Sequence, residues 1–132
     1  MLFRSLNGLT PKLVLKAVTV DGNPITFFQN TNVVSSSIFD RGLPTQKITV
    51  PSDSIDAAIS RSSANIIVMD VEGGEIDLLG AADLALVREI IVEVHPHIVG
   101  VPAIESMIEF LLLSGFSVKE RLHKTVWLSR AG

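Results

Sequence analysis

The chain has 132 residues, enough for one domain around a single hydrophobic core, so we expect one domain over residues 1–132. Its 11 lysines and arginines against 14 aspartates and glutamates argue against a nucleic acid partner, and the absence of cysteine excludes thiol chemistry and predicts a cytoplasmic protein. Charged residues or glycines interrupt every apolar run before the roughly 20 residues of a membrane span, so we expect no membrane partner.

The first half of the chain predicts short strands around a polar loop. The strands are predicted where apolar and β-branched residues dominate, at 13–20, 25–30 and 47–51. Residues 30–44 are rich in Ser, Asn and Gly and show no period, which predicts a loop. Ser52 or Asp53 is then expected to cap a short helix that ends near Ser60.

The second half predicts a β-α-β unit followed by a helix and a hairpin. Uninterrupted apolar runs at 64–71 and 88–94 are typical of parallel strands buried on both faces, and the residues between them predict a crossover helix broken near Gly80. Apolar residues at helical spacing predict a helix over 102–114. Residues 116–130 predict a closing antiparallel hairpin. The expected fold class is therefore α/β with a mixed sheet.

Acidic residues and a histidine stand at the ends of the two predicted parallel strands. Asp70 and Glu72 follow the first apolar run, and Glu93 and His95 end the second. Residues two apart on an extended chain share a side, and the carboxyl ends of parallel strands meet at one edge of a sheet. If the two strands are neighbours, their carboxylates and imidazole lie in one small volume, as proton transfer requires.

Structural interpretations of the same residues stay open. Glu72 and Glu75 could be helix caps that face the helix dipole, and His95 could be a hydrogen-bonded histidine at a strand end. An unpaired carboxylate is costly to bury, so we expect Asp70 and Glu93 to be more buried than most acids and to have hydrogen-bond partners. Asp70, Glu72, Glu93 and His95 could also bind a hard divalent ion, but their spacing matches no standard metal-binding motif, so no metal site is predicted.

The segment from residue 66 to residue 95 resembles the FkbM family of methyltransferases. That family has a strand ending in D-x-E-G-x-E, a leucine-rich helix start followed by Gly-Ala, and a strand ending in E-x-H. These positions are Asp70, Glu72, Gly73, Glu75, Leu79, Gly80, Ala81, Glu93 and His95. A weaker resemblance over 13–59 extends the similarity to nearly the whole chain. It implies a three-layer Rossmann-like fold.

The resemblance also implies a chemistry. Family members use S-adenosylmethionine, and the name points to O-methylation of a small-molecule or sugar hydroxyl. The implied catalytic residues are Asp70, Glu72 and His95, and Asp70 would also contact the cofactor. The implied substrate-binding residues are Glu93, Gly73 and Glu75.

One part of the family pattern does not occur in this sequence. The glycine-rich cofactor loop of the D-x-G-A-N-x-G kind and the strand ending in Glu-Pro are absent, so the chain resembles the carboxyl-terminal half to two-thirds of a class I methyltransferase. We expect the strand at 66–70 to have a free edge, filled either by residues 13–20 or by a second copy in a homo-oligomer. An alternative function is therefore a catalytically silent domain that acts as a homo-oligomer or binding module.

Overall fold

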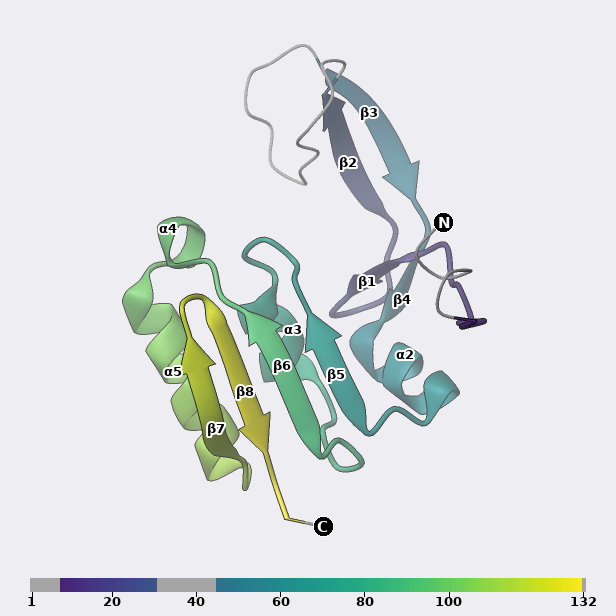
Figure 1. The fold of residues 1–132 in the computed structure, drawn as a ribbon. Coiled ribbons are helices and arrows are strands. Elements are labelled where there is room, and N and C mark those ends of the chain that lie inside the picture. Colours follow the sequence, from purple (N-terminus) through teal and green to yellow (C-terminus); the bar gives the residue numbers. More distant parts are fainter. Residues whose placement is uncertain (1–7, 31–44, 132) are drawn as a thin grey trace. The chain divides into compact units, whose positions relative to one another are not determined.

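The computed structural model describes residues 8–30 and 45–131 (Figure 1). The chain divides into two compact units. One consists of Met1–Ala17 and Pro24–Ser52, and the other of Val18–Asn23 and Asp53–Gly132. The residues that the sequence singles out for chemistry all belong to the second unit. In the described part of the chain, no helix is long and apolar enough to cross a membrane.

The first half of the chain forms two small two-stranded sheets. Strand β2 (Ile25–Asn30) pairs antiparallel with β3 (Thr45–Val50), which confirms the strands predicted at these positions. Strand β1 (Ala17–Thr19) pairs with β4 (Ser52–Ser54). The predicted loop at 30–44 lies, beyond its first residue, outside the described residues.

The strand predicted at 13–20 is shorter than expected and has a different partner. Only three of its residues form β1, because a turn begins directly after Thr19. The Thr19 hydroxyl accepts the N–H of Gly22, and the Asp21 carboxylate accepts the N–H of Asn23. The hydrogen bonds that Asn23 donates to the Asp21 carboxylate lower the pKa of Asp21. Since β1 pairs with β4, the predicted pairing of this segment with the strand at 66–70 is wrong.

Helix α2 (Ile55–Ser62) begins two residues later than a cap at Ser52 would require. Its N-cap is Ser54, whose backbone is extended and whose Oγ accepts the N–H of Ala57 at 3.1 Å. Ser52 cannot cap the helix because it belongs to β4. The last residue of the helix is Ser62, which lies past the predicted end at Ser60. The C-cap residue, Ser63, has the left-handed conformation.

The second unit contains a four-stranded mixed sheet. Its order is β5 (Ile66–Met69), β6 (Glu89–Glu93), β8 (Thr125–Ser129) and β7 (Ser117–Leu122). Strands β5 and β6 are parallel, while β8 runs antiparallel to both β6 and β7. The predicted adjacent parallel strands and the predicted closing hairpin are therefore confirmed.

Three helices connect the strands of this sheet. Helix α3 (Glu75–Ala81) is the predicted crossover, and α5 (Val101–Leu113) lies within one residue of the predicted helix. A single-turn helix, α4 (Pro96–Val99), was not predicted because four residues are too few to show a helical period. Pro96 occupies its first position, where the fixed φ of proline suits a helix start.

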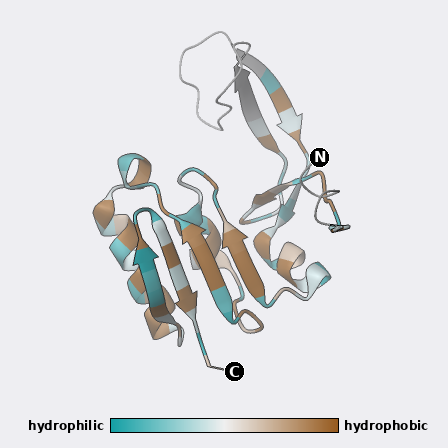
Figure 2. Ribbon diagram, viewed as in Figure 1, coloured by the Kyte–Doolittle hydropathy of each residue, from teal (hydrophilic) through white to brown (hydrophobic). Residues whose placement is uncertain are grey.

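Burial alternates along β5, β6 and β8, so the hydrophobic core lies on one face of the sheet. Figure 2 shows that β5 and β6 are mostly hydrophobic, whereas β7 is mostly hydrophilic. The buried strand residues are Ile67, Met69, Ile90, Val92, Val126 and Leu128, in one cluster with side chains of α2, α3 and α5. The opposite face exposes Ile66, Val68 and Trp127, and Val68 keeps 75% of its surface. The prediction that β5 is buried on both faces is wrong, because its alternate side chains have no cover among the described residues.

Side chains on the surface connect α5 and β8 to their neighbours. Arg121 on β7 donates to Glu105 on α5 at 2.6 Å, which lowers the pKa of Glu105 and raises that of Arg121. Both side chains are about half exposed, so this pair contributes little to stability. Arg130, after β8, donates to the carbonyls of Leu84 and Ala85, which holds the end of the sheet against the loop before β6.

Candidate functional site

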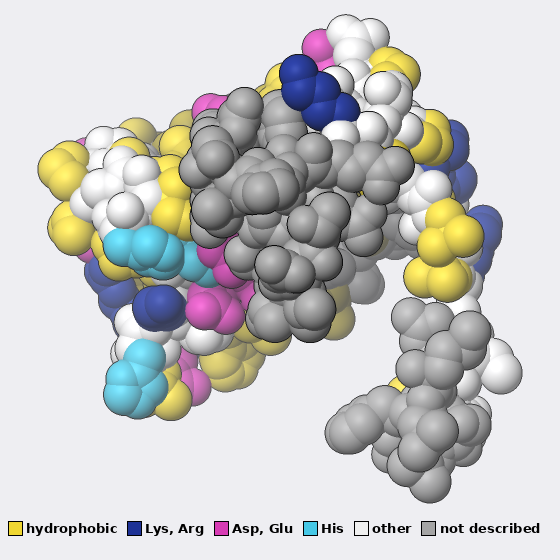
Figure 3. Space-filling view, turned by 90° about the horizontal axis from the view of Figure 1, so that it is seen from above, with side chains coloured by type: hydrophobic (Ala, Val, Ile, Leu, Met, Phe, Trp, Pro, Cys, Tyr) yellow, Lys and Arg dark blue, Asp and Glu magenta, His cyan; other side chains and the backbone are white. Residues whose placement is uncertain are grey.

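The candidate site lies at the carboxyl ends of β5 and β6. These two strands are parallel neighbours, so the residues that follow them emerge at the same edge of the sheet. Figure 3 views the molecule from this end and shows histidine and acidic side chains next to one another. We call Asp70, Glu72, Glu93 and His95 the acid–histidine cluster.

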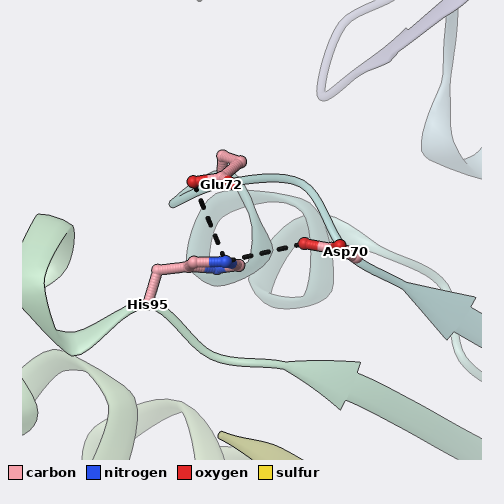
Figure 4. Close-up of side chains that lie close together, drawn as sticks. All are labelled: Asp70, Glu72 and His95. Atoms are coloured by element: carbon pink, nitrogen blue, oxygen red, sulfur yellow. Dashed lines mark ion pairs between the residues drawn. The ribbon is translucent and has the colours of Figure 1, made fainter. Parts of the chain in front are cut away.

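The imidazole of His95 is the centre of the cluster (Figure 4). Its Nε2 lies 3.5 Å from Asp70 Oδ1, 3.8 Å from Glu72 Oε2 and 3.9 Å from Glu93 Oε1. The sequence therefore predicted correctly which residues come together. Their individual roles in catalysis and binding remain predictions.

His95 itself is almost completely buried, with 3% of its surface exposed. Its Nδ1 is fully enclosed and forms no hydrogen bond with the described residues. Glu75 Oε1 lies 3.4 Å from Nδ1. The imidazole thus has one buried carboxylate at Nδ1 and three carboxylates at Nε2.

Glu75 is the buried carboxylate and has no exposed surface. Its Oε1 accepts the backbone N–H of His95 at 3.0 Å, and its Oε2 accepts the backbone N–H of Gly73 at 2.8 Å. One side chain thereby joins the loop after β5 to the end of β6. These contacts favour a structural role for Glu75, although not the helix cap that the sequence left open, because α3 has no side-chain cap hydrogen bond.

The predicted burial is wrong for Asp70, and the predicted hydrogen-bond partner is wrong for both Asp70 and Glu93. The side chain of Asp70 is 62% exposed and that of Glu93 is 39% exposed, and neither accepts a hydrogen bond from the described residues. Strand β5 ends at Met69, so Asp70 already lies outside the core. Glu93 alternates with the buried Val92 and therefore lies on the open face of the sheet.

The turn between β5 and α3 places Glu72 in an unusual backbone conformation. Glu72 has a φ of 50° and Gly73 a φ of 100°, and the N–H of Gly74 closes the turn on the carbonyl of Val71 at 3.1 Å. The left-handed conformation is costly for a residue with a Cβ, and such residues occur often at functional sites. Because Glu75 accepts the N–H of Gly73, that amide is not free to bind a ligand.

Replacing Gly73 by alanine is expected to lower the free energy of unfolding by about 2 kcal/mol. The new Cβ would lie 2.8 Å from Ile98 Cγ2, and alanine tolerates a φ of 100° poorly. The matched control is Gly80→Ala in α3, where a Cβ meets no atom within 4 Å and helix propensity should raise stability by about 0.5–1 kcal/mol. Urea denaturation of both variants measures the difference, and equal stability would show that the turn is not packed as described.

No lysine or arginine among the described residues forms an ion pair with the acids of the cluster. The ion pairs of Asp70, Glu72, Glu93 and Glu75 all involve His95. The remaining ring neighbour of His95 is His97, whose ring centroid is 5.8 Å away in an edge-on arrangement. Such a site can take up a proton or attract a cation.

A shallow groove elsewhere in the second unit does not belong to the cluster. It lies near the amino ends of β5 and β6, at the opposite end of these strands. Its lining residues are Asp56, Ile59, Ser60, Ser63, Asp83 and Leu86. None of them is a residue that the sequence analysis singled out for chemistry.

Comparison with known proteins gives one match. A family model described as the methyltransferase FkbM domain matches residues 14–118, which include the whole acid–histidine cluster. No curated protein and no solved structure matches the chain. The matched segment covers most of the sequence, as the resemblance of the strand-end motifs had predicted.

Proposed function

This chain belongs to the FkbM methyltransferase family, and we propose that it carries the acceptor-binding and proton-transfer part of an S-adenosylmethionine-dependent O-methyltransferase. The observation that carries the proposal is the position of His95 Nε2 within 3.9 Å of three carboxylates. These residues lie at the carboxyl ends of adjacent parallel strands, where open α/β sheets bind their ligands. The proposed acceptor is the hydroxyl of a small molecule or a sugar.

Transfer of a methyl group to a hydroxyl requires that the hydroxyl lose its proton. When bound, S-adenosylmethionine supplies an electrophilic methyl carbon and leaves as S-adenosylhomocysteine. Glu72 Oε2 and His95 Nε2 are the groups proposed to take the proton, since their side chains lie 3.8 Å apart at the same strand ends. The carboxylates of Asp70 and Glu93 lie 3.5 and 3.9 Å from the same Nε2.

The described residues fit one end of this cofactor better than the other. The carboxylates of the cluster suit its cationic sulfonium end, and Asp70 is the proposed contact. The groove near α2 lies at the opposite ends of the strands, so it cannot hold the adenosine end of a cofactor whose methyl group reaches the cluster. The described residues therefore account for the transfer end.

The exposed apolar face of the sheet suggests where the rest of a complete site would pack. Strand β5 is an edge strand of its sheet, and its side chains Ile66 and Val68 are exposed. In a three-layer Rossmann-like fold, further strands and helices cover such an edge and face. We propose that a cofactor-binding segment, or a second copy of the chain, packs against β5.

The same exposed face supports the alternative function. A domain that has lost its cofactor site could persist as a homo-oligomer or binding module through Ile66, Val68 and Trp127. The two functions differ in one measurable property. Only a methyltransferase turns over S-adenosylmethionine once its cofactor site is complete.

The cytoplasmic location remains a prediction from composition.

Calorimetric titration with S-adenosylmethionine tests the proposal on two proteins. One is this chain, and the other is a fusion in which the glycine-rich cofactor segment of a full-length family member precedes it. We expect micromolar binding by the fusion and no heat from the chain alone at millimolar ligand, because the cluster contacts only the transfer end.

Two outcomes would overturn parts of this account. Micromolar binding by the chain alone would show that its own residues form the adenosine site. A folded fusion that binds S-adenosylmethionine but transfers no methyl group to any of a set of methyl glycosides and simple alcohols would favour the binding module. Circular dichroism of both proteins provides the control for folding.

A further inference from the structure

We propose that the acid–histidine cluster binds a divalent metal ion through Asp70 Oδ1, Glu72 Oε2 and His95 Nε2. These three atoms all lie within 4.8 Å of one another, and two of the pairs are 3.5 and 3.8 Å apart. Around a six-coordinate ion with bonds of about 2.1–2.2 Å, adjacent ligand atoms are about 3 Å apart and opposite ones about 4.3 Å. Shifts of several tenths of an ångström in the exposed side chains of Asp70 and Glu72 would bring the three ligand atoms to the distances that such an ion requires.

The buried imidazole gives an independent reason for an ion at this position. Figure 4 shows the ring of His95 directed at Asp70 and Glu72, His95 is only 3% exposed, and its Nδ1 has no hydrogen-bond partner among the described residues. An imidazole with its proton on Nδ1, toward Glu75, presents the lone pair of Nε2 to three carboxylates. That arrangement is repulsive until a cation stands between the lone pair and the oxygens.

Glu75 supplies the support that a histidine ligand needs. Histidines that bind metals usually direct their other ring nitrogen at a carboxylate, which fixes the tautomer and the ring orientation. Glu75 Oε1 lies 3.4 Å from Nδ1 and is itself fixed by the backbone N–H groups of His95 and Gly73. A buried carboxylate is thus already in the supporting position.

The ligand set indicates the kind of ion and the openness of the site. Two carboxylates and one imidazole suit Mn²⁺ or a similar transition metal better than Mg²⁺, which prefers oxygen ligands alone. Three protein ligands leave positions for water or for a substrate oxygen. Both carboxylate side chains are exposed, so these positions face outward.

The site has a role that rests on the proposed function. An acceptor hydroxyl bound to the ion becomes more acidic and is held beside the cluster. Glu93 lies 3.9 Å from His95 Nε2 and is outside the three-residue ligand group, so it remains free to take the proton of the hydroxyl. When the ion is bound, Glu72 and His95 are its ligands, so Glu93 replaces them as the group that takes the proton.

Titration of the 132-residue chain with Mn²⁺, followed by electron paramagnetic resonance of the free ion, tests the site without cofactor or acceptor. We expect about one Mn²⁺ per chain. Asp70→Asn, Glu72→Gln and His95→Gln should each weaken binding at least 10-fold, and Glu75→Gln should weaken it roughly 10-fold through the orientation of His95. The matched control is Glu109→Gln, an exposed acid on α5 whose removal should leave binding unchanged.

The outcomes separate this inference from the proposed function. Absence of bound Mn²⁺, or equal binding by wild-type chain and Asp70→Asn, would overturn the metal site. Asp70 is exposed, so this variant should fold even if His95→Gln does not. The proposed function would survive that result, because S-adenosylmethionine binding and methyl transfer by the fusion are measured separately. Loss of transfer on chelation with EDTA, restored by Mn²⁺, would support both.

Discussion

The Glu75→Ala variant is expected to lose about 3–5 kcal/mol of its free energy of unfolding. Removal of the carboxylate leaves the partly buried N–H of Gly73 and the buried N–H of His95 without their acceptor, and each such group costs about 1–3 kcal/mol. The cavity left by a fully buried side chain adds to this cost. Urea denaturation with an unchanged m-value measures the loss.

Two further variants define the cause of this loss. Glu75→Gln keeps the size and one carbonyl oxygen, so it should cost about half as much as alanine. Asp77→Ala removes an exposed acid from the first turn of the same helix and should change stability by less than about 1 kcal/mol. Equal stability of Glu75→Ala and Asp77→Ala would contradict the claim that Glu75 joins the two strand ends.

The sequence predicted the elements that position the site because their patterns are local. The apolar runs before Asp70 and Glu93 identified two adjacent parallel strands, and the helical period identified α5 to within one residue. The proximity of the four cluster residues followed from the order and direction of the two strands alone. These features depend on periodicity and chain direction, which a single sequence contains.

The sequence could not predict features that depend on tertiary contacts. It overestimated the burial of Asp70, because an apolar run does not reveal that only one face of β5 is covered. It placed Glu75 at a helix start but could not show that this side chain reaches the N–H of His95, twenty residues later. The signal that was available was the acid two positions after Gly73, at the first residue of α3.

The second large effect is expected on methyl transfer by the fusion that carries a complete cofactor segment. Replacing His95 by glutamine, or Glu72 by glutamine, should lower turnover by roughly 10²- to 10⁴-fold, the usual contribution of a positioned acid, base or metal ligand. Glutamine keeps the approximate size of both side chains but cannot take up a proton. Affinity for S-adenosylmethionine should change little, because the adenosine end lies outside the cluster.

His97→Gln is the matched control for this effect. His97 is exposed in α4, its ring lies beside that of His95, and it contacts none of the carboxylates of the cluster. Its replacement should leave turnover within about threefold of the unchanged fusion. Urea denaturation of each variant separates lost chemistry from lost folding, since a change in a buried polar cluster can destabilise the protein by several kcal/mol.

The most direct test of the acid–histidine cluster as a transfer site is the rate at which label passes from S-[methyl-³H]adenosylmethionine to a methyl glycoside acceptor. The assay compares the fusion with its His95→Gln and His97→Gln variants at saturating cofactor. We predict that the unchanged fusion and His97→Gln transfer label at similar rates and that His95→Gln is at least 100-fold slower. Transfer by folded His95→Gln within threefold of the unchanged fusion would contradict the account and leave the cluster a structural feature of the strand ends.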